Sequence, residues 1–184
     1  LQNKTITHLT RVARLRAMRG GTACSGAGET PDFIRTDGVN LCDSHGNRFE
    51  IRGTNLGNWL NPEGYLFQFP KSTNSPHRIH EGLCQLVGPA YMEQFWQTFR
   101  ERYITQEDID YIASTGVTTI RLPFHYKLFT NEEYLGSRDP ETGFALVDRL
   151  VAWCREAGLR LILDMHDWPG GPPGDNTHGC YSHP

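Results

Sequence analysis

The chain has 184 residues, of which 38% are hydrophobic and 21% are charged, and its formal net charge is −3. This length suits one ordinary domain with a packed core. No cluster of Lys and Arg occurs after residue 31, which argues against nucleic acid as a partner because phosphate binding needs concentrated positive charge. No apolar run approaches transmembrane length, so we expect no membrane partner either.

Residues 1–31 do not read as part of a packed fold. The stretch begins without Met, contains several arginines, and has no apolar core of a secretory signal. A transit peptide would fit its composition, but we interpret it as a disordered or non-native leader. The domain is therefore expected to span residues 32–184.

The cysteine pattern excludes one common small fold and leaves the compartment open. There is no Cys-x-x-Cys pair, which disfavours a zinc ribbon, and the odd number of cysteines does not decide the redox environment. One of them falls on the apolar face of a predicted helix, where a buried free thiol is the ordinary interpretation. The five are Cys24, Cys42, Cys84, Cys154 and Cys180.

The first predicted elements are a β-hairpin and a long loop. Turn-forming residues at 37–38 and 44–47 separate hairpin arms at residues 39–41 and 48–51. The second arm is expected to continue into a strand at residues 52–55. Residues 61–88 are rich in Pro, Ser, Asn and Gly, which predicts a long loop that is functional or disordered.

Helices and strands then alternate to the end of the chain. Pro89 suits a first helical turn, and aromatic residues follow it at helical spacing. Thr105 and Asp108 have the spacing of a capping box, and Gly116 ends that helix. A strand at 118–122, a helix at 141–157 and a strand at 159–165 complete the pattern, with a loop at 170–184. The second of these strands is almost wholly apolar, as in a strand covered on both faces. This order predicts an α/β fold with a parallel sheet.

Three short β-type segments end in polar and aromatic residues. In a barrel of eight parallel strands, the site lies at the C-terminal ends of the strands. We therefore expect residues 32–184 to be the N-terminal portion of a TIM (β/α)8 barrel, preceded by the β-hairpin and truncated after the third strand, because a complete barrel needs roughly 200 residues or more. The strand-end residues are Asn55, Trp59, Arg121, His125, His166 and Trp168.

The same segments resemble glycoside hydrolase family 5, the cellulase and exo-β-1,3-glucanase family. They read RGTNLGNWL with PEGY, GVTTIRLPFHY, and LRLILDMHDWPGG with GDN, and the resemblance covers roughly residues 33–184. It implies an O-glycosyl hydrolase for polysaccharide degradation, acting on cellulose or β-1,3-glucan with a retaining mechanism and without a cofactor. It also implies β-linked polysaccharides or oligosaccharides as partners and an extracellular or periplasmic location.

A retaining glycosidase needs two carboxyl groups about 5 Å apart. In the family both are Glu, on the fourth and seventh strands, and this chain has no Asn-Glu-Pro motif. The resemblance assigns supporting catalytic roles to Arg121, beside the nucleophile, and to His166, which lines the subsite of the cleaved sugar. An ordinary strand-end salt bridge and a structural histidine are the alternatives. The chain alone is expected to be inactive.

Further residues are candidates for contact with sugar. The resemblance places Glu63 against a terminal sugar, and Asp175 and Asn176 on sugar hydroxyls, whereas a solvated carboxylate and simple turn formation are the alternatives. Indole rings could stack on sugar faces, although core packing is the more common role. The substrate-binding candidates are Glu63, Asn55, Trp59, His125, Asp175, Asn176 and Trp168.

Two other classes of function remain open. His178, Cys180 and His183 with Asp175 could bind zinc, but their spacing fits no standard structural site, so no metal is predicted. A non-catalytic carbohydrate-binding fragment would use the same supporting residues only to hold sugar.

Overall fold

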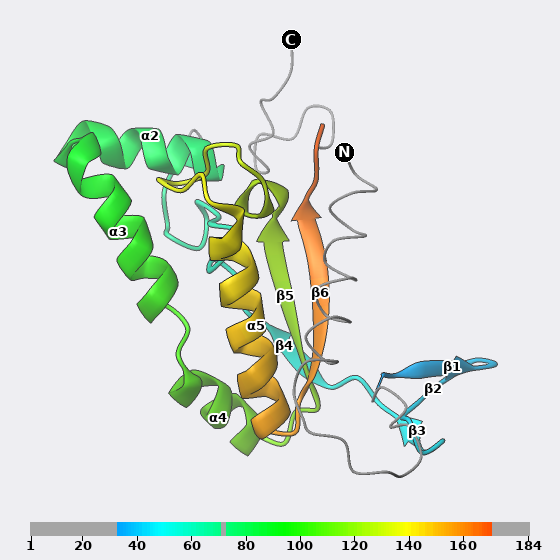
Figure 1. The fold of residues 1–184 in the computed structure, drawn as a ribbon. Coiled ribbons are helices and arrows are strands. Elements are labelled where there is room, and N and C mark those ends of the chain that lie inside the picture. The colour runs from blue at the N-terminus through cyan, green and yellow to red at the C-terminus, as the bar shows by residue number, and fades with distance from the viewer. Residues whose placement is uncertain (1–32, 71–72, 171–184) are drawn as a thin grey trace, which may run out of the picture. The chain divides into compact units, whose positions relative to one another are not determined.

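The computed structural model describes residues 33–70 and 73–170 (Figure 1). The chain divides into two compact units, and the second begins at Ile51. In the described residues no helix is both long enough and apolar enough to cross a membrane.

The first unit contains a small antiparallel sheet. Its strands are β1 (Arg35–Asp37), β2 (Asn40–Cys42) and β3 (Arg48–Phe49), in the order β1-β2-β3. The predicted hairpin is confirmed by the pairing of β2 with β3. The prediction missed β1, because a three-residue exposed strand has no apolar alternation to reveal it.

The turn between β2 and β3 is organised by one carboxylate. Asp43 Oδ1 accepts hydrogen bonds from the backbone N–H groups of His45 and Asn47, and Oδ2 accepts one from Asn47 Nδ2. These bonds favour the ionised form, so the Asn47 side chain first, and then the backbone, lowers the pKa of Asp43. Gly46 adopts φ of 82°, a conformation that glycine takes without steric cost.

The second unit is built on a three-stranded parallel sheet. Its strands are β4 (Gly53–Asn55), β5 (Thr119–His125) and β6 (Arg160–Asp167), in the order β4-β5-β6. Both pairings are parallel, as the alternation of helices and strands predicted. Strand β4 approaches β5 closely, since a Cβ atom at Gly53 would lie 2.0 Å from the carbonyl oxygen of Thr119. Any residue larger than glycine at position 53 would therefore clash with the backbone of β5.

The long loop predicted for residues 61–88 is wrong, because it contains helix α2 (Pro76–Val87). Ser75 caps this helix by accepting a hydrogen bond from the backbone N–H of Arg78, and Pro76 occupies the first turn. Only Pro76 and Ile79 are buried in it. Ile79, Leu83, Leu86 and Val87 do recur at helical spacing, but the many Pro, Ser, Asn and Gly residues around them outweighed this signal in the prediction.

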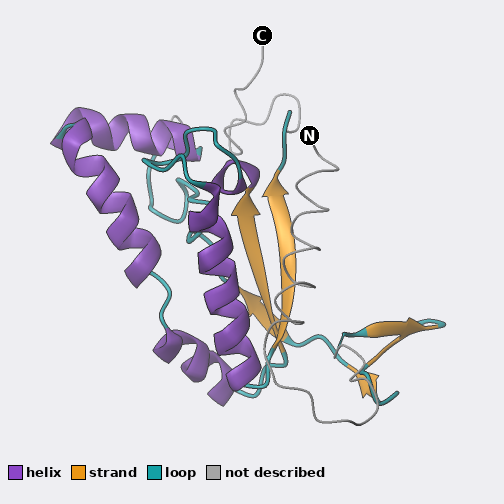
Figure 2. Ribbon diagram, viewed as in Figure 1, coloured by secondary structure: helices purple, strands orange, loops and turns teal. Residues whose placement is uncertain are grey.

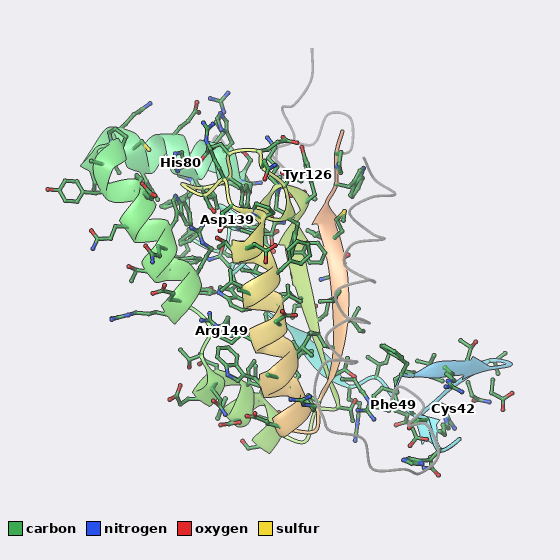
Figure 3. All side chains as sticks on the ribbon, in the orientation of Figure 1. Cys42, Phe49, His80, Tyr126, Asp139 and Arg149 are labelled. Atoms are coloured by element: carbon green, nitrogen blue, oxygen red, sulfur yellow. The ribbon has the colours of Figure 1, made fainter. Side chains whose placement is uncertain are left out.

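The other helices follow the predicted pattern. They are α3 (Pro89–Arg102), α4 (Gln106–Ser114) and α5 (Pro140–Glu156), with a short 3-10 helix, η2 (Tyr126–Phe129), after β5. Asp108 Oδ2 accepts hydrogen bonds from the backbone N–H and the hydroxyl of Thr105, so the predicted cap of α4 is confirmed. Asp139 caps α5 by accepting from the backbone N–H of Glu141 (Figure 3).

The core lies between the sheet and α5, which runs along it (Figure 2). Alternate residues of β5 are Ile120, Leu122 and Phe124, and all three are almost fully buried. The ring of Phe124 contacts that of Phe129, which in turn contacts Phe144 of α5. This face of the sheet therefore packs against the helices.

The expectation that β6 is covered on both faces is wrong for the described chain. Ile162 and Leu163 point to opposite faces of the strand, and they are 39% and 44% exposed. The reason is that β6 is an edge strand whose partner among the described residues is β5.

We expect Leu122→Ala to destabilise the chain by about 2–5 kcal/mol, because it removes a fully buried side chain and leaves a cavity. Leu86→Ala is the matched control, since Leu86 is 79% exposed on α2. Urea unfolding of both variants would measure the difference. Equal losses of stability would contradict the packing of β5 described above.

Burial raises the pKa of Cys154 to about 11, since the thiolate is disfavoured away from water. Cys154 should therefore stay unreactive towards iodoacetamide between pH 7 and 9, while the half-buried Cys42 and Cys84 are labelled. Peptide mass spectrometry after pulse labelling would measure this, with urea-unfolded chain as the control. Labelling of Cys154 at the rate of Cys42 in folded protein would contradict the burial.

Candidate functional site

The candidate site forms on the face of the sheet opposite α5. Because side chains alternate along a strand, Arg121 points away from the helix-facing Ile120 and Leu122. The register pairs Asn55 with Arg121, and Arg121 with Ile162. Asp164 and His166 follow Ile162 at alternate positions of β6. The predicted convergence of Arg121 and His166 on one part of the sheet is therefore confirmed.

A continuous hydrogen-bond network joins these side chains. One terminal nitrogen of Arg121, Nη1, donates to Asn55 Oδ1 at 3.2 Å, and the other, Nη2, donates to Asp164 Oδ2 at 2.5 Å. Nδ1 of His166 lies 3.0 Å from the same Asp164 oxygen and 3.3 Å from Arg121 Nη2. The three charged or titratable side chains are 29–36% exposed, so the network is accessible to a ligand.

An irregularity in the ladder sets the position of His166. Phe124 pairs with Met165, whereas His125 pairs with Asp167, so the register shifts between them and His166 is the extra residue. Bulges of this kind re-aim a side chain and are common next to sites. Asp167, one residue further on, is fully buried.

The loop after β4 holds Glu63. The side chain of Asn58 accepts a hydrogen bond from the backbone N–H of Glu63 at 2.9 Å and donates to the hydroxyl of Tyr103 at 3.4 Å. Asn58 is buried and adopts φ of 66°, the left-handed region that Asn tolerates better than most residues. Burial, followed by the negative charge of Glu63, raises the pKa of Tyr65.

Two other candidates are packed inside the unit. Trp59 is 1% exposed, and its indole N–H donates to the carbonyl oxygen of Arg100 at 2.8 Å. His125 is 2% exposed, and its ring stacks on those of Tyr126 and Tyr134. Both residues therefore make packing contacts, whereas Trp168 is 41% exposed at the end of β6.

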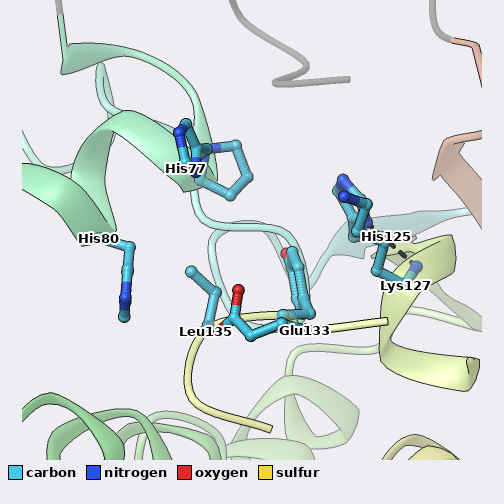
Figure 4. Close-up of a pocket in the computed structure, with 8 residues that line it drawn as sticks. His77, His80, His125, Lys127, Glu133 and Leu135 are labelled. Carbon is cyan, nitrogen blue, oxygen red and sulfur yellow. Dashed lines mark hydrogen bonds between the residues drawn. The ribbon is translucent and has the colours of Figure 1, made fainter. Parts of the chain in front are cut away.

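A small cavity lies beside His125 (Figure 4). Its volume is about 60 Å³, which suits a few water molecules and not a sugar ring. The lining histidines have other contacts: His80 Nδ1 accepts from Trp96 Nε1, and His77 pairs with Glu81. The residues of the lining are Pro76, His77, His80, His125, Lys127, Glu133, Tyr134 and Leu135.

Metal ligands are not brought together in the part of the chain that the structure describes. Among residues 33–70 and 73–170, no group of three or more His, Cys, Asp and Glu side chains could hold a metal ion. The alternative zinc ligands and two substrate-binding candidates lie outside these residues. They are Asp175, Asn176, His178, Cys180 and His183.

Sequence reasoning overlooked the importance of Asp164. No role was assigned to this residue from the sequence. The structure places its carboxylate between Arg121 and His166. The available signal was the i, i+2 spacing of Asp164 and His166, which puts both on one face of a strand.

The model of the cellulase family, glycosyl hydrolase family 5, matches residues 83–179. The chain belongs to this family. It is 32% identical over 139 residues to a β-xylosidase of Phanerodontia chrysosporium, covering 76% of this chain and 28% of that protein. It is 30% identical to a probable glucan 1,3-β-glucosidase A of Aspergillus niger, covering 70% of this chain and 31% of that protein.

Among solved structures, the chain is similar to the rutinosidase from Aspergillus niger. The TM-score is 0.52 at 25% sequence identity, covering 67% of this chain and 34% of that one. The chain thus spans about a third of the length of the relatives it matches.

We expect Asn58→Ala to destabilise the chain more than Asn58→Gly, by about 1 kcal/mol, because alanine is strained at positive φ. Both variants lose the hydrogen bonds to Glu63 and Tyr103, so their difference isolates the backbone conformation. Chemical unfolding would measure it. An alanine variant as stable as the glycine variant would contradict the left-handed conformation of this turn.

Proposed function

We propose that the chain forms the first three strands of a retaining β-glycosidase barrel and supplies the supporting half of its site. The observation that carries this proposal is the network of Asn55, Arg121, Asp164 and His166 on one face of a parallel sheet. This supports the proposal because Arg121, which the family resemblance puts beside the nucleophile, and His166, which it puts at the subsite of the cleaved sugar, belong to one network.

Arg121 suits the role of holding that carboxylate ionised. A guanidinium offers five N–H donors, and both terminal nitrogens of Arg121 are oriented, one by Asn55 and the other by Asp164. A positive charge within ~4–6 Å favours the ionised form of a carboxyl group, and a nucleophile must be ionised to attack the anomeric carbon. Asp164 thus orients Arg121, and Arg121 in turn would orient the nucleophile.

We assign neither Asp164 nor Glu63 to the reacting pair. Asp164 is bonded to Arg121 and lies beside His166, and Glu63 lies on the loop after β4. The reacting Glu residues implied by the resemblance belong to the fourth and seventh strands. We therefore propose that the 184-residue chain binds sugar without hydrolysing it.

The substrate class follows from the relatives. Two of them are named as a β-xylosidase and a probable glucan 1,3-β-glucosidase. We propose a β-linked glycan, most specifically a β-glucan, as the substrate of the whole protein, with Trp168 and Glu63 as additional sugar contacts. Trp168 offers an exposed ring for stacking on a sugar face.

The first test uses the chain itself. Purified chain would be incubated with soluble β-1,3-glucan, carboxymethyl cellulose and aryl β-glycosides, while its size is followed by light scattering. We expect no release of sugar above that of a His166→Ala variant, because the paired carboxylates are missing. Turnover by soluble monomer well above this control would overturn the proposed division of the site.

The second test uses the full-length gene product that contains this segment. Its product should appear first as the β-anomer in proton NMR spectra, as double displacement requires. Arg121→Ala should lower kcat by about 10²-fold or more, a loss of the size seen for one preorganised charge-stabilising donor. Arg155→Ala, an exposed arginine of α5, is the control and should be neutral. Inverted product would refute the retaining mechanism.

A further inference from the structure

Nδ1 of His166 has two possible hydrogen-bond partners in the network, and the position of the ring proton decides which bond forms. Nδ1 of His166 lies 3.0 Å from a carboxylate oxygen of Asp164 and 3.3 Å from Nη2 of Arg121. An ionised carboxylate only accepts hydrogen bonds, and a guanidinium only donates them. Nδ1 of a neutral imidazole therefore makes one of these two bonds and not both.

The geometry favours the bond to Asp164. Its oxygen is the nearer of the two partners, and a hydrogen bond to a charged acceptor is roughly twice as strong as a neutral one. The nitrogen of Arg121 already donates to the same oxygen at 2.5 Å. The opposite arrangement would also point the lone pair of Nδ1 at a negative oxygen 3.0 Å away, which is repulsive.

We propose that Asp164 is a positioning residue that fixes His166 in the tautomer protonated at Nδ1. The lone pair of the ring then lies on Nε2, the nitrogen turned away from Asp164 and Arg121. Nε2 of His166 is consequently a hydrogen-bond acceptor. If the proposed glycosidase function holds, a sugar hydroxyl that reaches this nitrogen would act as the donor.

Arg121 competes with Asp164 for the hydrogen bond to Nδ1 of His166. Without the carboxylate, residue 164 offers no nearer acceptor, so Nη2 of Arg121 donates to the lone pair on Nδ1 of His166. The proton of the ring then moves to Nε2, which changes from an acceptor into a donor. Removal of one carboxylate therefore changes Nε2 of His166 from a hydrogen-bond acceptor into a donor.

The tautomer can be measured directly on the 184-residue chain. Long-range proton-nitrogen correlation spectra of ¹⁵N-labelled protein, taken where the ring is neutral, separate the protonated from the unprotonated ring nitrogen. Loss of the signal in His166→Gln assigns the resonance. We expect a protonated Nδ1 in the native chain and a protonated Nε2 in Asp164→Ala. Native protein with a protonated Nε2, or an unchanged tautomer in folded Asp164→Ala, would overturn the proposal.

The chain carries internal references for the same spectra. Nδ1 of His125 accepts from the backbone N–H of Lys127, and Nδ1 of His80 accepts from Trp96 Nε1, so both rings are protonated at Nε2 when neutral. Their signals should not move in Asp164→Ala, which shows that the fold persists. Asp110→Asn, an exposed carboxylate of α4, is the matched control and should leave His166 unchanged.

Asp164→Asn keeps the test decisive if the alanine variant fails to fold. The amide oxygen is a weaker acceptor than a carboxylate, so the population protonated at Nδ1 should fall below that of the native chain. A native population in Asp164→Asn would overturn the proposal. None of these measurements depends on turnover. A ring protonated at Nδ1 together with no glycosidase activity in the full-length protein would refute only the proposed function. Glycosidase activity together with a native ring protonated at Nε2 would refute only the inference about the tautomer.

Discussion

Arg121 connects all three strands of the parallel sheet through its side chain. It extends from β5, donates to Asn55 of β4 and pairs with Asp164 of β6. The ion pair is about one-third exposed, and pairs at such positions contribute only ~0–1 kcal/mol to stability. Its importance is therefore positional. The guanidinium is held in one orientation by neighbours on both sides, and this orientation also brings Asp164 to His166.

One face of the parallel sheet provides hydrophobic burial, and the other face carries the polar network. Ile120, Leu122 and Phe124 are buried beside the helices and provide the hydrophobic burial that stabilises the unit. Arg121 lies between them in sequence but on the other face, since successive side chains of a strand alternate. Stability and polar chemistry thus come from the same seven-residue strand, and substitutions on one face need not disturb the other.

The family motifs show which segments surround the candidate site, but they do not give the role of each residue within those segments. In the first motif, Trp59 is a core residue bonded to the carbonyl of Arg100, and Asn58 holds the turn that carries Glu63. In the second motif, His125 is enclosed by two tyrosine rings beside a cavity of about 60 Å³. Much of each motif therefore builds the support of the site, while Arg121 and His166 present polar groups at its surface.

The sequence by itself determined the features that depend on neighbours along the chain. The cap at Thr105 and the proline start of α3 mark helices through local hydrogen bonds and restricted backbone angles, and the alternation of helix and strand predicted the parallel sheet. Arg121 and His166 were placed together because parallel strands end on one side.

Tertiary structure decided whatever depended on register and burial. The exposure of Ile162 and Leu163 follows from the position of β6 at the edge of the three-stranded sheet that the described residues form. The contact of Asp164 with Arg121 spans 43 residues, and the bulge at His166 arises only in pairing with β5. Hydrophobic periodicity reports which face of an element is apolar, whereas the partner of a polar side chain is chosen by the packing of distant segments.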